Sequence, residues 1–227
     1  MSYLPHVADE NDLPTLQQIK DAFGFVPNFY LAQTIRPDLI NAEAQLVDAI
    51  LVKEGALTRQ QKEYIFLVCS AANLSTYCVT AHCEMVRMLG IEGPEPEQIA
   101  LDHTTANLPM QMKALLNFAA KLNRQPTKVS RRDIDALHTY GYNDEQVLET
   151  VLMVGLAKFA NFVAFGLGTA PDFDASKVVL RGAETARAKE RSMPPRHRSA
   201  EEVSPPHRRL PQNLTKSSDV PNDLRIL

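Results

Sequence analysis

The sequence has few glycines and few cysteines, and it lacks a long, uninterrupted apolar run. Its nine glycines are scattered, so no phosphate-binding loop, nucleophile elbow or kinase signature is present. No apolar segment reaches membrane-spanning length, and the acidic, polar start of the chain does not resemble a signal peptide. No segment alternates apolar and polar residues with a period of two. These absences argue against nucleotide-binding loops and β-sheet folds, and they predict a cytoplasmic protein that has no membrane partner.

The chain has only three cysteines, Cys69, Cys78 and Cys83, which lie within fifteen consecutive positions. An odd, clustered set does not suit a disulfide-stabilised scaffold. It suits a local thiol site in a reducing compartment. Cys69 stands inside a strongly apolar segment and is expected to be a core residue, whereas Cys83 fits either packing or a secondary redox thiol.

The length of 227 residues allows one substantial domain and a tail. The composition changes after residue 173. Residues 174–227 hold eleven Lys and Arg against seven Asp and Glu, are rich in Pro, Ser and Arg, and contain no aromatic residue. We therefore expect a domain over residues 1–173 and a basic tail over 174–227, helical to about 191 and disordered beyond 192. The formal net charge of −3 gives no reason to expect a nucleic-acid partner, and a solvated tail explains the basic segment.

Apolar residues recur at helical spacing along most of residues 1–173, which predicts an all-α fold. Caps, glycines and prolines punctuate these segments. The expected helices cover residues 14–23, 30–35, 37–52, 60–72, 75–89, 97–103, 109–122, 131–140 and 145–166. The last of them is apolar on all sides, so it is expected to be buried between subunits as well as within one.

The most informative stretch runs from residue 63 to residue 89. Ser75, Cys78 and His82 are spaced three and four apart, which places their side chains on one face of a helix. Glu63 lies twelve residues before Ser75, and a helix break at residues 72–75 would fold its carboxylate back toward the same place. A thiol, an imidazole and a carboxylate brought together in this way form an acid/base-assisted sulfur site.

Two features are expected to activate Cys78 as a thiolate. If Ser75 or Asn73 caps the helix, the thiol lies in its first turn, where unpaired amides favour negative charge. His82, one turn later, can bond the sulfur and accept its proton, and Glu63 can orient His82 or pass that proton on to solvent.

Tyr77, beside Cys78, is expected to donate a hydrogen bond to a bound peroxide or to a product oxygen. The segment lacks the paired C-x2-C or H-x3-H spacing of a zinc site, so we expect neither a metal nor another cofactor. No basic residue near the motif is expected to anchor an anionic substrate.

The pattern E-x11-S-x2-C-x3-H resembles the E-x11-C-x2-C-x3-H signature of the AhpD-like alkylhydroperoxidases in the carboxymuconolactone decarboxylase superfamily. The sequence around it, and the upstream segment FGFVPNFYLAQTIRPDLI, resemble the peroxidase-related branch. The likeness covers about residues 3–173 and implies an AhpD-like helical bundle that assembles as trimers or hexamers. It also implies that Cys78 becomes a sulfenic acid, with Glu63 and His82 as proton relay. The first cysteine of the family's pair is Ser75 here.

This resemblance implies a hydroperoxide reductase that works through Cys78 and an external thiol or dithiol, with peroxidase activity altered or lost because of Ser75. Two alternatives remain open. One is an acid/base enzyme of the carboxymuconolactone decarboxylase type, in which His82 and Glu63 act and the cysteine is incidental. The other is a non-catalytic, oligomeric redox-sensing protein.

Overall fold

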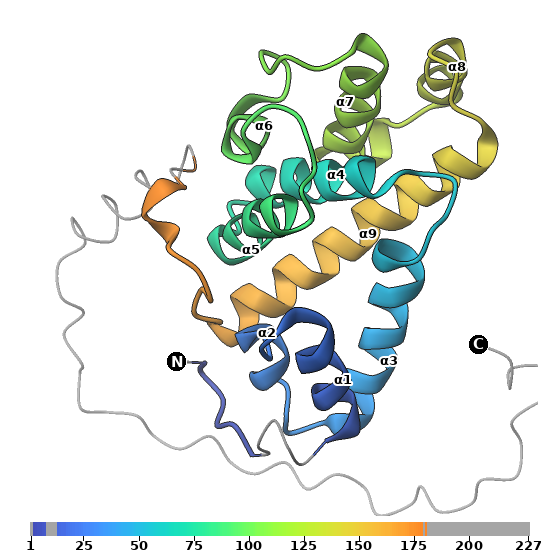
Figure 1. Ribbon diagram of the computed structural model, residues 1–227. Helices are drawn as coiled ribbons and strands as arrows, with labels where there is room; N and C mark the ends of the chain where they lie inside the picture. The colour runs from blue at the N-terminus through green and yellow to red at the C-terminus, as the bar shows by residue number, and fades with distance from the viewer. Residues whose placement is uncertain (1, 8–12, 179, 181–227) are drawn as a thin grey trace, which may run out of the picture. The chain divides into compact units, whose positions relative to one another are not determined.

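A computed structural model of the protein describes residues 2–7, 13–178 and 180, and the described backbone contains helices but no strand (Figure 1). The all-α expectation is therefore confirmed. The expected disorder beyond residue 192 and most of the expected helix over 175–191 lie outside the described residues. Within that helix, only a short 3-10 turn at Ala175–Lys177 is described.

Each expected helix forms, with ends shifted by a few residues. The α-helices are α1 Pro14–Phe23, α2 Asn28–Leu31, α3 Pro37–Val47, α4 Arg59–Ala72, α5 Thr76–Met88, α6 Pro96–Asp102, α7 Met110–Arg124, α8 Arg131–Thr139 and α9 Asp144–Leu167. A π-helical turn at Asp48–Val52 continues α3, and a 3-10 turn at Pro126–Lys128 follows α7.

Local sequence explains where these helices begin and end. Thr58 and Gln61 form a reciprocal capping box at the start of α4, and Asn143 and Gln146 form another at the start of α9. Gly24 closes α1 with φ of 82°, a left-handed conformation that glycine adopts without a Cβ clash. These are short-range signals, which is why the sequence predicts them.

Helix α4 lies at the centre of the described fold, with α5, α6, α7 and α9 packed against it (Figure 1). Every residue from Lys62 to Ser70 is buried, and Tyr64, Ile65 and Leu67 are each 0% exposed. A helix covered on several sides needs apolar residues around most of its circumference. The near-continuous apolar sequence of α4 meets that need.

Helix α9 is the longest helix described, and it contradicts the expectation that no apolar segment reaches membrane-spanning length. It spans 24 residues with a mean hydropathy of 1.7 over its most apolar window, so it is long and apolar enough to cross a membrane. Nevertheless, it packs along α4, α5 and α7, as the core helix of a globular domain does. Only 44% of that window is buried, so a broad apolar face of α9 is uncovered.

The chain reverses between α4 and α5, as predicted. Leu74 takes a φ of 61°, an uncommon left-handed conformation for a residue with a bulky side chain. The amide of Ser75 then donates to the carbonyl of Ser70 at 2.9 Å, which closes the turn. Because α5 returns alongside α4, residues from both helices meet at one site.

Candidate active site

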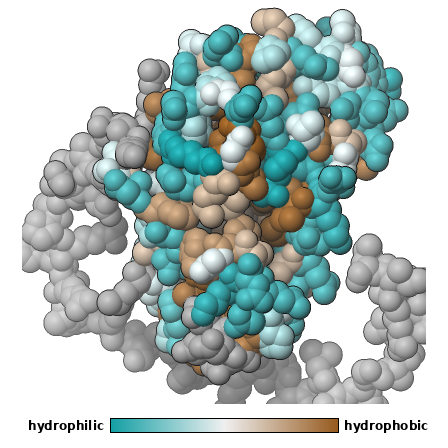
Figure 2. Space-filling model, in the orientation of Figure 1, coloured by the Kyte–Doolittle hydropathy of each residue, from teal (hydrophilic) through white to brown (hydrophobic). Residues whose placement is uncertain are grey.

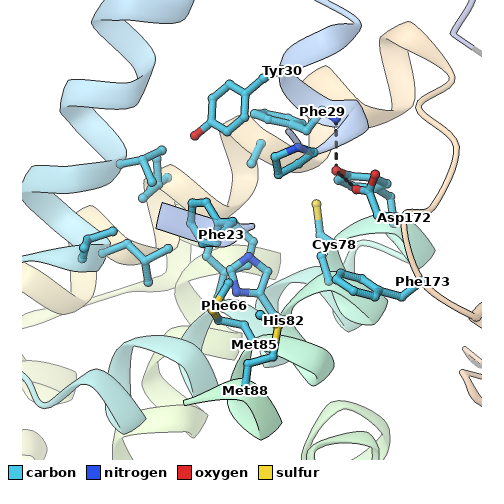
Figure 3. A pocket seen from close by; sticks show the side chains of 18 of the residues that line it. Phe23, Phe29, Tyr30, Phe66, Cys78, His82, Met85, Met88, Asp172 and Phe173 are labelled. Carbon is cyan, nitrogen blue, oxygen red and sulfur yellow. Dashed lines mark hydrogen bonds between the residues drawn. The ribbon is translucent and has the colours of Figure 1, made fainter. Parts of the chain in front are cut away.

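A cavity of about 120 Å³ opens where α1, α2 and α3 face α4, α5 and α9 (Figure 3). Most of its wall is apolar. Seven aromatic residues line it: Phe23, Phe25, Phe29, Tyr30, Phe66, Tyr77 and Phe173. Met85 and Met88 add two flexible thioethers. The charged or reactive residues in the wall are Arg59, Cys78, His82 and Asp172. A cavity of this composition fits an apolar organic ligand.

Cys78 stands in the first turn of α5, where it was expected, and lines the cavity (Figure 3). Cys78 is only 3% exposed. Burial raises the pKa of the thiol, and the nearby Ser75 and Asn161 side chains offset this only in part. The expectation of a resting thiolate is therefore wrong, because burial is the largest influence on the thiol and raises its pKa, and no hydrogen bond joins Cys78 to His82 among the described residues.

Glu63 and His82 do meet, as the helix reversal predicts. Nδ1 of His82 lies 2.6 Å from Oε2 of Glu63, and Nε of Arg59 donates to Oε1 at 2.8 Å. Glu63 is fully buried. Burial raises its pKa, but the charges and hydrogen bonds of His82 and Arg59 together outweigh burial and hold the pKa below its usual range.

The ionised carboxylate of Glu63 fixes the orientation of the His82 ring. Because a carboxylate only accepts hydrogen bonds, Nδ1 must carry the hydrogen, which leaves Nε2 of a neutral ring as the basic nitrogen. The ring also stacks on Phe66, with centroids 3.7 Å apart and planes 20° apart. His82 is thus held in one tautomer and one orientation at the cavity wall, as a proton acceptor requires.

The hydroxyl of Tyr77 is already used. It donates to Oδ2 of Asp172 at 2.6 Å and accepts from the amide of Phe29 at 3.1 Å. The expected donation to a peroxide is therefore wrong for this arrangement. Asp172 also accepts from the amide of Asn28 at 2.9 Å, so Tyr77 anchors the segment after α9 over the cavity. Nothing in the sequence indicated Asp172, because it lies 95 residues from Tyr77 and in no motif.

Ser75 occupies the N-cap position of α5, but its side chain makes no capping hydrogen bond. Its hydroxyl is buried and has no partner of regular hydrogen-bond geometry among the described residues. The side chain nevertheless lies close enough to the Cys78 sulfur to lower the thiol pKa.

A buried amide cluster lies behind Cys78. Asn161 on α9 is 0% exposed; its Nδ2 donates to Oγ of Ser70 at 3.0 Å and its Oδ1 accepts from Nδ2 of Asn73 at 2.8 Å. Asn73 and Asn123 exchange two further bonds of 3.2 Å and 2.9 Å. Asn73 is therefore part of this cluster and does not cap α5. The cluster holds the α4–α5 reversal against α7 and α9, and Asn161 also interacts with the Cys78 sulfur.

The other two cysteines are packing residues. Cys69 is 0% exposed and Cys83 is 1% exposed. Burial raises the pKa of each thiol to about 12, so neither is a ready nucleophile. All three cysteines are free. Among the described residues, no group of His, Cys, Asp and Glu is arranged to hold a metal ion.

Arg59 is the functional residue that the sequence reasoning missed. It stands at the start of α4, four residues before Glu63, and lines the cavity. The i, i+4 spacing to Glu63 was the available signal. The expectation of no basic residue near the motif is therefore wrong, since Arg59 places a guanidinium beside the Glu63–His82 pair.

Comparisons with known proteins identify this fold. No protein-family model and no curated protein matches the sequence. An uncharacterised peroxidase-related protein from Ralstonia eutropha JMP134, described as an alkylhydroperoxidase AhpD core, is 30% identical. The match covers 78% of this chain and 95% of that one, with a TM-score of 0.71.

Two further solved structures share the fold. A peroxidase-related protein from Silicibacter sp. TM1040 is 26% identical over 78% of this chain and 93% of its own, with a TM-score of 0.69. A cysteine-to-alanine variant of the debrominase Bmp8, in complex with 2,3,4-tribromopyrrole, is 20% identical over 84% of this chain and 99% of its own, with a TM-score of 0.65. The helical order, the Glu63–His82 pair beside Cys78 and these matches lead to one conclusion: the chain belongs to the AhpD-like superfamily.

Proposed function

We propose that the protein reduces organic hydroperoxides with Cys78 as a single peroxide-attacking cysteine and an external thiol as reductant. One observation carries the proposal: Cys78 and the imidazole oriented by Glu63 line the same apolar cavity. The peroxidase-related neighbours of the same fold support the reaction class.

The reaction begins from a protonated thiol, because burial raises the pKa of Cys78. As the hydroperoxide enters, Nε2 of His82 takes the thiol proton and the sulfur attacks the terminal peroxide oxygen. The O–O bond breaks, a new S–O bond forms, and the departing alkoxide receives the proton as an alcohol. Cys78 is left as a sulfenic acid.

Reduction of the sulfenic acid then requires two external thiols. The first displaces water and forms a mixed disulfide with Cys78, and the second releases Cys78 as a thiol and leaves an external disulfide. No internal partner is suited to this step. Ser75 has no sulfur, and the thiols of Cys69 and Cys83 are buried with raised pKa values.

Replacing Ser75 by cysteine tests this proposal. Residues three apart on a helix have Cα atoms about 5 Å apart, within the range that a disulfide spans. After one equivalent of hydroperoxide, the wild type is expected to gain the mass of one oxygen atom at Cys78. Ser75→Cys is expected instead to lose the mass of two hydrogens as a disulfide closes. Intact-mass spectrometry measures both mass changes, and peptide mapping distinguishes oxygen on Cys78 from oxygen on Met85 or Met88.

The matched control for Ser75→Cys is Ser130→Cys, which places the added thiol at the N-cap of another helix, α8, at an exposed position that does not line the cavity. It should retain the wild-type oxygen adduct. A wild type that takes up no oxygen would contradict the proposal and favour a protein without peroxide chemistry. Oxidation of Cys78 without turnover by any thiol would favour a redox sensor.

Acid/base chemistry on a lactone acid is the second candidate, and Arg59 is the observation that favours it. A guanidinium beside the Glu63–His82 pair supplies the anion contact that such a substrate needs. In that reaction the Cys78 thiol would be dispensable, so the two candidates predict opposite results for its removal.

We propose further that the uncovered face of α9 is the contact surface of a homo-oligomer, a trimer or a hexamer. Figure 2 shows apolar residues gathered across the middle of the face on which α9 lies in Figure 1. The exposed apolar residues of α9 are Leu148, Val151, Leu152, Phe159, Phe162 and Phe165. Phe162 is 64% exposed, and burying a phenylalanine contributes about 1.5–3 kcal/mol.

Phe162→Asp is expected to lower the assembled mass, because each copy would then bring a charge into an apolar contact. Light scattering coupled to size-exclusion chromatography measures this. Glu145→Gln, in the exposed first turn of the same helix, should leave the mass unchanged. An unchanged mass for Phe162→Asp would contradict this contact surface.

A further inference from the structure

We infer that Arg59 forms a carboxylate-binding subsite in the cavity, so that the preferred substrate is an apolar organic hydroperoxide that also carries a carboxylate. This inference rests on the proposed function, since it names the substrate class of that same site.

Arg59 uses only part of its guanidinium. Nε donates to Oε1 of Glu63 at 2.8 Å, and no described residue accepts a hydrogen bond from the two terminal nitrogens. The side chain is 26% exposed and lines the cavity. Two parallel N–H groups at the end of a guanidinium match the two oxygens of a carboxylate. Since Glu63 holds the Nε side, the fork is fixed in place before a ligand arrives.

Several other polar atoms in the cavity wall are already hydrogen-bonded to the protein. Both oxygens of Asp172 are occupied, one by Tyr77 and one by the amide of Asn28. Nδ1 of His82 is occupied by Glu63. What remains for a ligand is the guanidinium fork, the Tyr30 hydroxyl, Nε2 of His82 and the Cys78 thiol. An anionic group is therefore attracted to Arg59 and disfavoured beside Asp172.

The rest of the cavity wall determines which kind of framework the substrate has between its carboxylate and its hydroperoxide group. Because the cavity is lined mainly by aromatic rings and methionines, it favours an apolar, and particularly an aromatic, framework between the two ends. Hydrogen peroxide would leave this wall unfilled. A carboxylate on Arg59 would orient such a framework, with the hydroperoxide group toward Cys78.

The test compares two substrates of the same shape: cumene hydroperoxide and its analogue with a carboxylate on the para carbon of the ring. For the wild type, kcat/KM is expected to be about tenfold to a hundredfold higher for the carboxylate, the value of one charge-assisted hydrogen-bonded pair. In Arg59→Gln this ratio should fall to near one, and in Arg59→Lys it should be intermediate. Arg132→Gln, an exposed arginine on α8, should keep the wild-type ratio.

The ratio of the two kcat/KM values distinguishes a role of Arg59 in substrate binding from its role in holding Glu63 by a hydrogen bond. Loss of that support would lower kcat/KM for both hydroperoxides equally, and an unchanged ratio in Arg59→Gln would overturn the inference. If Arg59→Gln does not fold, Arg59→Lys must shift the ratio, and failure to do so would also overturn it.

A second measurement keeps the inference testable if neither hydroperoxide is reduced, a result that would reject the proposed function alone. Isothermal titration calorimetry then compares unreactive para-isopropylbenzoate with para-isopropylbenzamide, its neutral counterpart. Tighter binding of the carboxylate by the wild type, lost in Arg59→Gln, supports the subsite. Equal binding of the two compounds overturns it.

Discussion

Cys78→Ala is expected to abolish hydroperoxide-dependent oxidation of an external thiol, with a loss on the order of 10³-fold or more in kcat/KM. In the proposed reaction the sulfur of Cys78 itself takes the peroxide oxygen, and no other thiol lines the described cavity wall. The thioethers of Met85 and Met88 can be oxidised to sulfoxides, but an external thiol does not reduce these, so they support no turnover. Consumption of hydroperoxide in the presence of dithiothreitol measures the rate. The variant should remain folded, because it removes one small buried group from α5.

Cys83→Ala provides the matched control. Cys83 lies on the same helix and is equally buried, but it does not line the cavity. Its removal should leave kcat/KM within a few-fold of the wild type. Retention of full activity in Cys78→Ala would contradict the thiol mechanism and leave an acid/base reaction that depends on His82 and Glu63.

The pH dependence of Cys78 alkylation tests separately whether the thiol is protonated in the resting protein. Since burial raises the pKa of the thiol, the thiolate fraction should increase about tenfold per pH unit between pH 6 and 8 without a plateau. Alkylation of Cys78 by iodoacetamide, followed by mass, reads this directly. A plateau below pH 7 would mean that the thiol pKa is lowered in the folded protein.

Glu63→Gln is expected to lower kcat/KM about 10²-fold and the free energy of unfolding by about 3–5 kcal/mol. Arg59 and His82 each use a different oxygen of Glu63, and an amide keeps only one of the two, so its NH2 group would face one of their N–H donors. With its anionic partner lost, the imidazole no longer has a fixed tautomer. Steady-state kinetics and urea unfolding at pH 7 measure the two losses.

The stability loss should also depend on pH in a defined direction. The pKa of Glu63 is lowered in the folded protein, so its contribution is present above the ordinary value of 4.5 and disappears as pH falls through the lower folded value. The difference between wild type and Glu63→Gln should therefore shrink on acidification. Glu54→Gln, an exposed neighbour of α4, should change stability by less than about 0.5 kcal/mol. Full activity in Glu63→Gln would mean that the Glu63–His82 pair has only a structural role.

By itself, the sequence determined the helices, the reversal at residues 72–75 and the meeting of Glu63 with His82. These follow from caps and helical periodicity, which act over a few positions. The three-and-four spacing also placed Cys78 and His82 on one helix face, and this holds for any regular helix.

Only the tertiary structure decided how that face behaves chemically. Burial of Cys78 depends on how α5 packs against helices elsewhere in the chain, and it turned the expected thiolate into a protonated thiol. The segment after α9 brings Asp172 to Tyr77 from 95 residues away and takes the hydroxyl that was expected to serve a substrate. The exposure of Arg59 to the cavity likewise results from packing. Desolvation and long-range hydrogen bonds depend on which residues surround a side chain in space, and a local sequence pattern does not contain that information.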